Sequence, residues 1–430
     1  LEILHHQEID RIEVLFKVGC EAGTYIRKLC LHPQTDIMSN NGIVCASDFF
    51  ERPSNIYSYG KGKIIKIEPS QTQKFVSPDK LICIETSTGV KIMVTPDHKL
   101  FISTKTGYKM KEAQKLKDGD FLVKSLNAPF KSKEYIIADL LDENYLVDQA
   151  EIKEECKKAF IEKYGSIREM NRRVKLDRKN FLSNSKNAIT IKHLKLAGIY
   201  NKVKKRINRF KTQKGKVVKL TKLNKDHFYL MGLLASDGNN TKEKKTKRFT
   251  RLKFHNTEVS LINRFVSVYK KLFPSIPISK KELDKGLFQI DTANSLFATI
   301  CASLGIKSPY KDSDLLPILN AKPSLIKSFL KGYFDGDGTA YFKEKERIRG
   351  HYSNIRIYCV SYLNIKRIHQ MLLKLSISNR IIDIKSGFRR MYAIEVGDIH
   401  SKKKFIKEIG TNHPLKKDYF MNIRNLEGGS

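Results

Sequence analysis

The stretch Lys331-Gly332-Tyr333-Phe334-Asp335-Gly336-Asp337-Gly338 closes an apolar run that begins near Ser324. The apolar side chains of this run recur at helical spacing, at Leu325, Ile326, Phe329, Leu330, Tyr333 and Phe334. The pattern predicts a helix that stops at Gly338, in the left-handed conformation with which glycine often closes helices. Asp337 would then lie at the negative end of the helix dipole, where a carboxylate requires a compensating positive charge.

The same arrangement occurs once more, in Leu230-Met231-Gly232-Leu233-Leu234-Ala235-Ser236-Asp237-Gly238, and the two aspartates are 100 residues apart. Small residues would let two such helices approach closely, namely Gly232, Ala235, Ser236, Gly332 and Gly336. That contact would bring Asp237 and Asp337 together, and two carboxylates beside helix C-terminal carbonyls suit a hard divalent cation. Each Asp-Gly pair taken alone is also explained as a turn that ends a helix. The matched pair in a basic chain favours the metal site.

Both segments resemble the paired motif of LAGLIDADG homing endonucleases, in which the penultimate Asp of each copy binds the catalytic metal. The second copy keeps the acid, glycine and aromatic positions, whereas the first has Ala235 where the family often has an earlier acid. The resemblance implies that Asp237 and Asp337 are catalytic metal ligands and that the cofactor is Mg²⁺. It also implies a double-stranded DNA substrate, no small-molecule cofactor, and a monomer with internal pseudo-twofold symmetry.

Enzymes of this family usually place a lysine near the metal to stabilise the charge of the transition state. The position nearest to the usual lysine is Asp314 in this chain, so Lys311 is the catalytic candidate and Lys385 a weaker one.

The charge of the chain is concentrated in its second part. The 430 residues carry a net charge of +36, and residues 1–127 contribute 18 basic and 15 acidic side chains, which leaves +33 for residues 128–430. A basic excess of this size, in a chain with 23 Phe and 18 Tyr, favours a nucleic-acid partner over a merely solvated surface. The length allows two to four domains.

Cysteine usage and hydropathy bound the setting. The seven cysteines are odd in number and form no C-x-x-C pair, which indicates neither a disulfide framework nor a zinc site. We find no apolar run of membrane-spanning length and no signal peptide, and we expect no membrane partner. These features favour the cytoplasm of an archaeal or other microbial cell. The start at Leu1 without a methionine suggests an internal fragment.

Residues 1–29 contain a predicted strand over 11–18, followed by Gly23-Thr24-Tyr25-Ile26-Arg27. This segment resembles the Gly-Thr-Tyr-Ile-Arg sequence of the TruB/dyskerin family of pseudouridine synthases. The family's catalytic aspartate lies earlier in its sequence and is absent, so we interpret 1–29 as a fragment of a host protein that cannot isomerise uridine.

From Cys30 to residue 127 the sequence has short strand patterns separated by turns such as Asn41-Gly42, Thr88-Gly89 and Asp118-Gly119, which predicts a compact all-β region. The Cys-Leu-x-Pro-x-Thr run at Cys30, the Thr-x-x-His of Thr95 and His98, and Leu116-Lys-Asp-Gly-Asp120 resemble the N-terminal half of an intein's Hint domain. The resemblance implies that Cys30 attacks the Leu29 carbonyl while Thr95 and His98 polarise and protonate the amide. A buried cysteine and a structural histidine remain the alternative.

An intein should return to the β region after the nuclease and end in His-Asn, but this chain ends with 422–430, Asn-Ile-Arg-Asn-Leu-Glu-Gly-Gly-Ser. We therefore expect a truncated precursor in which splicing fails.

Residues 128–222 are predicted to form a basic helical segment. Ala150–Tyr164 has an amphipathic helical pattern, and Ser166 with Glu169 suggests a capping box for a second helix. Further helices are expected around Lys175–Lys179 and over Thr190–Ile199. Two interpretations stay open: a DNA-recognition insert, with Lys202–Lys219 as a phosphate-tracking arm, or a linker-like helical spacer.

Residues 223–308 and 309–425 have the pattern of two copies of one αββαββα unit. Alternation along Arg248–His255 places Thr250, Leu252 and Phe254 on one face of a strand, and Ile355–Cys359 alternates in the same way. Basic and polar side chains on the opposite face suit the major groove. The candidate DNA contacts are Arg248, Arg251, Lys253, His255, Arg356, Tyr358, Arg389 and Arg390.

The sequence thus predicts an α+β chain: a host fragment, an all-β Hint-like half, a helical insert and two pseudo-symmetric LAGLIDADG repeats. The expected function is a metal-dependent double-strand cut at the allele of the host gene that lacks the insertion. Three alternatives remain: a degenerate protein that only binds DNA, an RNA maturase of the same fold, or a protein whose main activity is thioester autoprocessing at Cys30.

Overall fold

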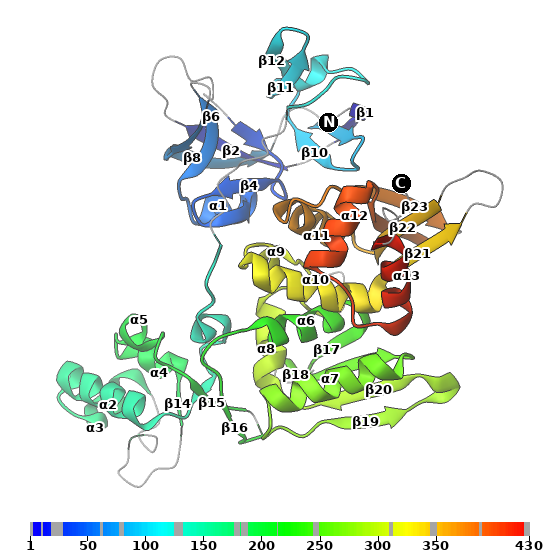
Figure 1. Ribbon diagram of the computed structural model, residues 1–430. Helices are drawn as coiled ribbons and strands as arrows, with labels where there is room; N and C mark the ends of the chain where they lie inside the picture. The colour runs from blue at the N-terminus through cyan, green and yellow to red at the C-terminus, as the bar shows by residue number, and fades with distance from the viewer. Residues whose placement is uncertain are drawn as a thin grey trace. The chain divides into compact units, whose positions relative to one another are not determined.

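The computed structural model contains both helices and strands throughout the chain, which confirms a mixed α+β protein (Figure 1). It describes residues 3–424 except for positions 10–11, 19–28, 61–62, 77–80, 124–131, 176–180, 182–187, 213, 244–248, 309–312, 345–350 and 387–388. The described residues form two compact units. Unit 1 comprises 1–133, 319–322 and 358–401, and unit 2 comprises 134–318, 323–357 and 402–430.

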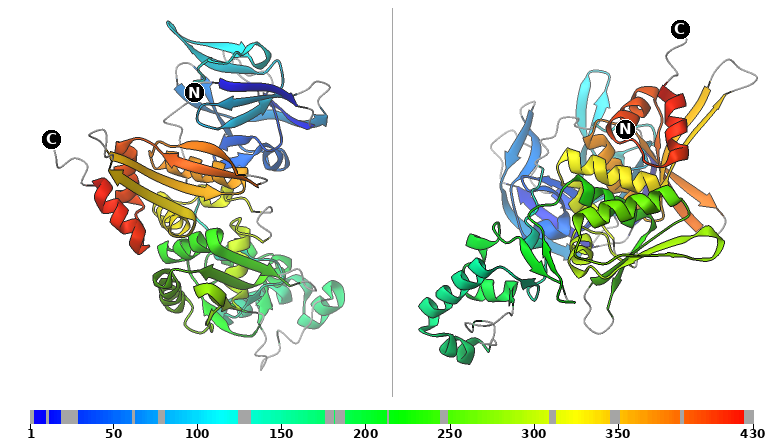
Figure 2. Two further views of the ribbon diagram at one scale, coloured as in Figure 1. Left: turned by 90° about the vertical axis from the view of Figure 1, so that its right-hand side faces the viewer. Right: turned by 60° about the horizontal axis from the view of Figure 1, so that its bottom comes forward.

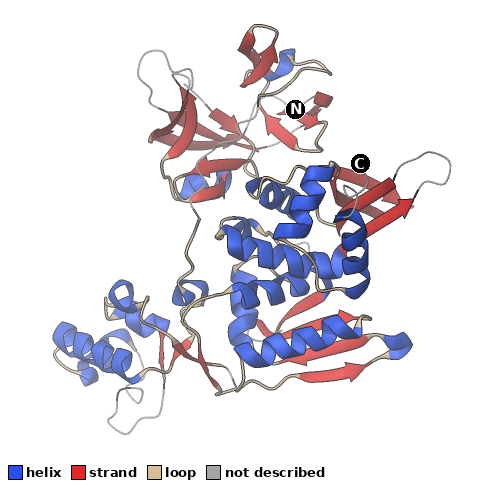
Figure 3. Ribbon diagram, in the orientation of Figure 1, coloured by secondary structure: helices blue, strands red, loops and turns tan. Residues whose placement is uncertain are grey.

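The first part of unit 1 consists almost entirely of strands (Figure 3). A six-stranded sheet has the order β1-β9-β10-β3-β2-β8, a four-stranded sheet has the order β5-β4-β6-β7, and β11 and β12 form a hairpin. The strands are β1 (Ile3–Ile9), β2 (Ile12–Val18), β3 (Leu29–Leu31), β4 (Asp36–Ser39), β5 (Gly42–Cys45), β6 (Ile56–Gly60), β7 (Lys63–Ile67), β8 (Pro69–Val76), β9 (Leu81–Thr86), β10 (Lys91–Val94), β11 (Lys99–Thr104) and β12 (Gly107–Glu112). One short helix, α1 (Ala46–Glu51), accompanies them.

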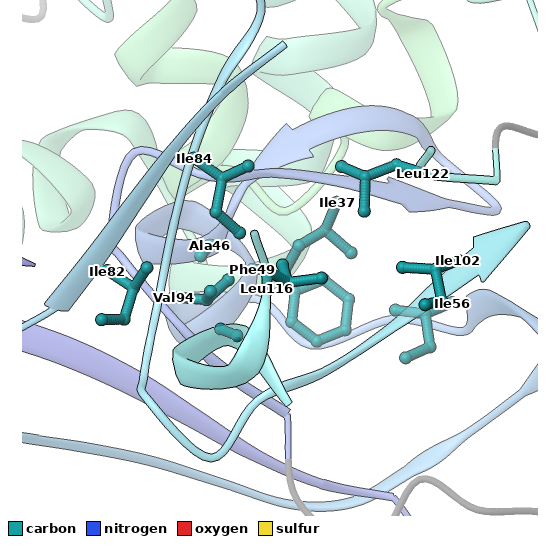
Figure 4. Close-up of a cluster of buried hydrophobic side chains, with 11 residues drawn as sticks. Ile37, Ala46, Phe49, Ile56, Ile82, Ile84, Val94, Ile102, Leu116 and Leu122 are labelled. Atoms are coloured by element: carbon teal, nitrogen blue, oxygen red, sulfur yellow. The ribbon is translucent and has the colours of Figure 1, made fainter. Parts of the chain in front are cut away.

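Alternating burial along these strands builds one apolar core (Figure 4). Its members are Ile37, Ala46, Phe49, Ile56, Ile82, Ile84, Val94, Ile102, Ala113, Leu116 and Leu122. The predicted turns are present, since Gly42, Gly89 and Gly119 have φ angles of 98°, 75° and 89°, which glycine adopts without strain. The predicted strand over 11–18 is β2, and it pairs with β3 in the six-stranded sheet.

The second part of unit 1 consists of α11 (Tyr362–Lys374) and the hairpin of β23 (Arg380–Ser386) and β24 (Arg389–Val396). Polar contacts join it to the β region. Buried Arg367 of α11 donates to Asp36 of β4 at 2.5 Å. The Tyr362 hydroxyl donates to the Gly89 carbonyl at 2.9 Å. The predicted second repeat, 309–425, therefore divides between the two units.

Residues 134–222 of unit 2 form an α/β module rather than a purely helical segment. Its helices are α2 (Ala150–Tyr164), α3 (Ile167–Val174), α4 (Ile191–Leu196) and α5 (Tyr200–Val203). A small sheet with the order β14-β13-β15-β16 was not foreseen, and it contains β13 (Leu146–Val147), β14 (Ile189–Thr190), β15 (Arg209–Lys211) and β16 (Val217–Lys219). These strands have two or three residues, too few to produce a recognisable period-2 pattern.

The predicted helix boundaries in this module are met in part. The first predicted helix has the bounds of α2, and Ser166 caps α3 by accepting from the Glu169 N–H at 3.1 Å. The Glu169 carboxylate binds Arg172 and Arg173 and does not complete a capping box. The helix expected over Thr190–Ile199 is shorter, because Thr190 is its N-cap and Gly198 has a φ of 80°. Positions 176–180, where another helix was expected, lie outside the described residues.

The remainder of unit 2 begins with one complete helix–sheet layer. The sheet order is β17-β18-β20-β19, and its inward side chains Leu252, Phe254 and Ile290 are buried, as the alternation predicts. The elements are α6 (Lys225–Asp237), β17 (Gly238–Lys242), β18 (Phe249–Asn256), α7 (Val259–Leu272), β19 (Ser279–Glu282), β20 (Phe288–Thr292) and α8 (Ser295–Ser303).

The following elements of unit 2 begin in the same way, with a long helix that leads into a hairpin of β21 and β22. They are α9 (Leu316–Leu319), α10 (Pro323–Asp337), β21 (Gly338–Glu344), β22 (His351–Cys359), α12 (Ile399–Glu408) and α13 (Pro414–Arg424). Both α6 and α10 pass directly into a strand at a glycine.

Candidate functional site

Helices α6 and α10 lie side by side, as the views of Figure 2 show, and two glycines set their separation. A Cβ atom on Gly232 would lie 2.1 Å from the Phe329 carbonyl oxygen, and one on Gly332 would lie 2.2 Å from the Tyr229 carbonyl oxygen. The two contacts are reciprocal, since each residue of one pair is 100 positions from its counterpart in the other. The expectation that small residues allow close approach is confirmed at these positions.

This close approach continues to the C-terminal ends of both helices. A Cβ atom on Gly336 would lie 2.6 Å from Oδ2 of Asp237 and 2.1 Å from the Ser236 hydroxyl oxygen. The Asp237 carboxylate therefore lies against the last turn of α10, which ends at Asp337. The predicted pair of acids is brought together at one end of the helix pair.

Burial and mutual repulsion shape the electrostatics of this pair. Burial raises the pKa of Asp337 to about 7, and the neighbouring Asp237 carboxylate raises it further, against the opposing charge of Lys416. Burial also raises the pKa of Asp237, although Asn256 donates a hydrogen bond to its Oδ2 at 2.9 Å. Two half-buried carboxylates that resist ionisation next to each other are typical of a site that takes up positive charge.

The positive charge that the end of α10 requires comes from Lys416 of α13. Its ammonium group donates to the carbonyl oxygens of Phe334, Asp335 and Gly336 at 2.7, 2.7 and 3.2 Å. These carbonyls have no partners within the helix, so Lys416 caps α10 and neutralises its dipole. Only 9% of Lys416 is exposed, and burial lowers its pKa to about 8. The sequence pattern missed this residue because it lies 79 positions after Asp337.

Asp335 holds the segment that carries Lys416. Its buried carboxylate accepts hydrogen bonds from the Tyr229 hydroxyl at 2.8 Å, from the Asn412 N–H at 2.9 Å, and from the Thr411 hydroxyl. This network joins α6, α10 and the turn before α13. The first motif copy has Ala235 at the corresponding place and lacks such a carboxylate.

The glycines that follow the two helices do not adopt the predicted left-handed conformation. Gly238 has φ −103° and ψ 168°, which is extended backbone, and Gly338 is not among the described glycines with positive φ. Glycine is needed there for space: a Cβ atom would lie 2.4 Å from the Leu234 carbonyl oxygen at Gly238, and 2.5 Å from the Phe334 carbonyl oxygen at Gly338.

The donor set fits a divalent cation. Asp237 and Asp337 supply hard oxygen ligands, and the missing Cβ of Gly336 leaves the Asp237 carboxylate uncovered by that residue. The carbonyls at the end of α10 are already occupied by Lys416, so the expected contribution from that helix end is not available. No group of three or more His, Cys, Asp or Glu side chains suited to a metal occurs in the described ranges. Water and substrate oxygens would complete the coordination.

The lysine candidates from the sequence cannot be placed. Lys311 lies outside the described residues, and so does the side chain of Lys385. The described cation nearest to the carboxylate pair in electrostatic terms is Lys416, which lowers the pKa of both aspartates.

The proposed DNA-contact residues have varied surroundings. Exposed Arg251 forms an ion pair with Asp291 at 2.7 Å, and exposed Arg390 forms one with Asp383. His255 shares a hydrogen bond with Gln289 at 3.0 Å. Half-buried positions are Lys253, Arg356 and Tyr358, while Arg248 and the side chain of Arg389 are outside the described part of the chain.

The residues proposed for thioester chemistry lie around the contact of β3 and β10. Leu31 pairs with Val94, so Cys30 and Thr95 each lie one residue from that pair. The side chain of Cys30 is outside the described residues, and its backbone pairs with Leu15. Thr95 is buried and its hydroxyl has no hydrogen-bond partner. His98 is half-buried, and its N–H donates to the Thr95 carbonyl at 3.1 Å.

Comparison with known proteins gives one family match. The model of the LAGLIDADG-like domain matches residues 324–410, from α10 to the end of α12. A catalogued component of the A-type ATP synthase of Methanopyrus kandleri is 27% identical over 279 residues, which covers 62% of this chain and 26% of that protein. The chain therefore spans about a quarter of the length of this relative.

Several solved structures of homing endonucleases are similar at low scores. I-DmoI in complex with DNA and Mn has a TM-score of 0.34 and 16% identity, and covers 44% of this chain and 98% of that chain. I-SmaMI bound to uncleavable DNA has a TM-score of 0.33 and 12% identity, with coverages of 47% and 90%. I-WcaI bound to its recognition sequence has a TM-score of 0.32 and 14% identity, with coverages of 46% and 87%.

None of the helices in the described ranges has both the length and the apolar character needed to cross a membrane. Residues 324–410, which contain Asp335 and Asp337, form a LAGLIDADG-like domain.

Proposed function

We propose that the chain is a site-specific endonuclease that hydrolyses one phosphodiester in each strand of duplex DNA and depends on a divalent cation such as Mg²⁺. The observation that carries this proposal is the pair of carboxylates, Asp237 and Asp337, at the abutting C-terminal ends of α6 and α10. The family match over 324–410 supports it, because the second of these helices lies within the match.

The residues of the site have separable roles. Asp237 and Asp337 would hold the cation, which supplies Lewis-acid charge for activating water and for the leaving oxygen. Lys416 lowers the pKa of both aspartates and fixes the end of α10. Asn256 orients the Asp237 carboxylate. The outward residues of β18 and β22, among them Lys253 and Arg356, would contact the major groove.

The proposed substrate is the uninterrupted target of an inserted element. Residues 30–127 would be the N-terminal half of a Hint domain and residues 1–29 the host fragment. The match to a quarter of an ATP synthase component supports an element that resides in unrelated genes. The target would then be duplex DNA that encodes Cys20–Leu29 joined to the next host Cys codon.

A cleavage assay tests this function. The purified chain, with Mg²⁺, is offered the uninterrupted duplex, the same duplex interrupted after the Leu29 codon, and an unrelated duplex. We expect a double-strand cut in the first alone. Equal cleavage of the first two would contradict the homing function, and no cleavage of any would favour a protein that only binds DNA.

Thioester chemistry at Cys30 is a second candidate function. The pairing of Leu31 with Val94 and the unpartnered hydroxyl of Thr95 favour it. Added thiol is expected to release a 29-residue leader from the chain, and release that persists in Cys30→Ala would contradict the mechanism.

A further inference from the structure

The basic side chains of residues 134–225 fall into two groups that differ in their partners. Those on the helices are largely neutralised by carboxylates of the same module. The ion pairs are Arg172 and Arg173 with Glu169 at 2.8 and 2.7 Å, Lys195 with Glu143 at 2.7 Å, Lys204 with Asp139 at 3.0 Å, and Arg206 with Glu155 at 2.7 Å. These helices therefore offer little free charge to a polyanion.

The second group lies on the hairpin of β15 and β16 and on the chain that follows it (Figure 1). No Asp or Glu occurs between Arg209 and Lys225, a stretch with seven basic residues. Arg209 binds Asp148 at 3.6 Å, but no carboxylate of the described residues forms an ion pair with the next five, namely Lys211, Lys214, Lys216, Lys219 and Lys222. The unneutralised charge of the module is concentrated here.

The register of the hairpin directs these lysines outward. Phe210 and Val218 are paired across the strands and buried, so their neighbours Lys211 and Lys219 lie on the opposite face. Lys214 and Lys216 lie exposed in the connecting turn, which closes through the Thr212 N–H donating to the Lys216 carbonyl at 2.8 Å. We refer to Lys214, Lys216, Lys219 and Lys222, which are all exposed, as the hairpin lysines.

The hairpin is fastened to the part of the chain that carries Asp237. The Ser275 hydroxyl, just after α7, donates to the Val217 carbonyl at 3.0 Å. Only residues 220–224 separate β16 from α6, and Leu220 and Leu223 in this connection are buried. The hairpin lysines are therefore held beside the α6–α7 half of the site instead of moving on a free linker.

The chemistry of this surface selects its partner. Residues 211–225 contain no aromatic side chain on which the bases of a single strand could stack. Their larger apolar side chains, Val218, Leu220 and Leu223, are buried and not available for insertion into a lipid surface. A row of unpaired ammonium groups without stacking or apolar groups suits the phosphates of a duplex, which present about one charge per 1.7 Å of helix axis.

We propose that the β15–β16 hairpin grips the phosphate backbone of duplex DNA that flanks the cleavage site on the α6 side, without reading its sequence. This inference rests on the proposed function for the identity of the substrate. It assigns the flanking contact to the hairpin and not to the helices α2–α5.

Two full-length variants with equal charge changes test it. The hairpin variant carries Lys214→Gln, Lys216→Gln, Lys219→Gln and Lys222→Gln. The control carries Arg172→Gln, Arg173→Gln, Lys195→Gln and Arg206→Gln, which removes exposed cations that already have carboxylate partners. Circular dichroism establishes that both fold. Binding to a duplex of arbitrary sequence is measured from low to moderate KCl without divalent cation.

The hairpin variant should bind at least about tenfold more weakly, and the slope of log K against log salt should fall by about 3 to 4, since each lost phosphate contact is worth about 0.9. The control should change the slope by less than about 1. Equal losses in both variants, or no loss in the hairpin variant, would overturn the inference. A hairpin-dependent preference for duplex RNA or for single strands over duplex DNA would also overturn it.

Failure of this inference is distinguishable from failure of the proposed function. Cleavage of plasmid DNA with Mg²⁺ at saturating protein should keep its position and rate in the hairpin variant. A chain that never cuts but shows hairpin-dependent duplex binding supports the hairpin contact and contradicts the nuclease.

Discussion

The ends of α6 and α10 carry matching aspartates but are stabilised by different groups. At α10, buried Asp335 anchors the turn before α13, and Lys416 returns from α13 to cap three carbonyls. At α6, Ala235 replaces the buried acid, and the described contact to the aspartate is the hydrogen bond from Asn256. The shared features are the acid, the following glycine and the reciprocal contacts of Gly232 and Gly332. What both ends keep is what a shared cation and a close helix contact require, whereas the capping groups serve a single helix end.

The largest expected effect is on cleavage. Asp237→Asn and Asp337→Asn should each reduce double-strand cleavage by more than about a hundredfold, because even groups that only support a metal ligand are worth about 10- to 100-fold. DNA binding should stay within about twofold. The matched control is Asp226→Asn at the start of α6, whose partner is Lys271. If one of the two aspartates is dispensable, the ends are not equivalent in function.

The next effect is on folding and tests the reciprocity of the helix contact. Gly232→Ala and Gly332→Ala each place a Cβ about 2 Å from a carbonyl oxygen of the other helix, so each should lower the free energy of unfolding by about 3 kcal/mol. Chemical denaturation measures this. Gly397→Ala is the control, because a Cβ there meets nothing within 4 Å. Losses that differ widely between Gly232 and Gly332 would contradict a reciprocal contact.

A smaller loss is expected from the cap that only α10 has. Lys416→Met leaves the carbonyls of Phe334, Asp335 and Gly336 without their donor and should cost about 2 kcal/mol. Lys417→Met, at the exposed neighbouring position, should be nearly neutral. Equal denaturation midpoints for the two variants would show that Lys416 does not hold the end of α10.

The smallest effect is a pH dependence. Because the pKa of Asp337 is about 7 in the folded protein and 3.8 is its ordinary value, the folded state binds its proton more tightly. Stability from this group is therefore complete at low pH and is lost as the pH rises from about 4 to 7. Asp237 and Lys416 face the group and set the size of the effect. Without divalent cation, Asp337→Asn should gain about 1–2 kcal/mol on the wild type between pH 5 and pH 8. A constant difference in unfolding free energy would contradict the raised pKa.

Local patterns explain which parts of this structure were predictable. The helical spacing before Asp237 and Asp337, the alternation along β18, and the bounds of α2 and α7 follow from contiguous residues. The strands β13–β16 are too short for a periodic signal, and their pairing depends on residues far apart in the chain.

The site was predictable to the same extent. Its carboxylates repeat a recognisable local motif, but Lys416 and Asn256 reach them only through the fold. The extended conformation of Gly238 was also missed, because the need for glycine there comes from a contact with Leu234 and not from its φ angle.

Direct measurement of cation binding tests the central claim that the two helix ends share one site. Calcium is titrated calorimetrically into the chain bound to duplex DNA, for the wild type, for the Asp237→Asn/Asp337→Asn double variant, and for Asp226→Asn. Our account predicts binding to the wild type and to Asp226→Asn, with proton release at pH 6 that diminishes by pH 8, and no binding at this site in the double variant. The same affinity and stoichiometry in the double variant would contradict it.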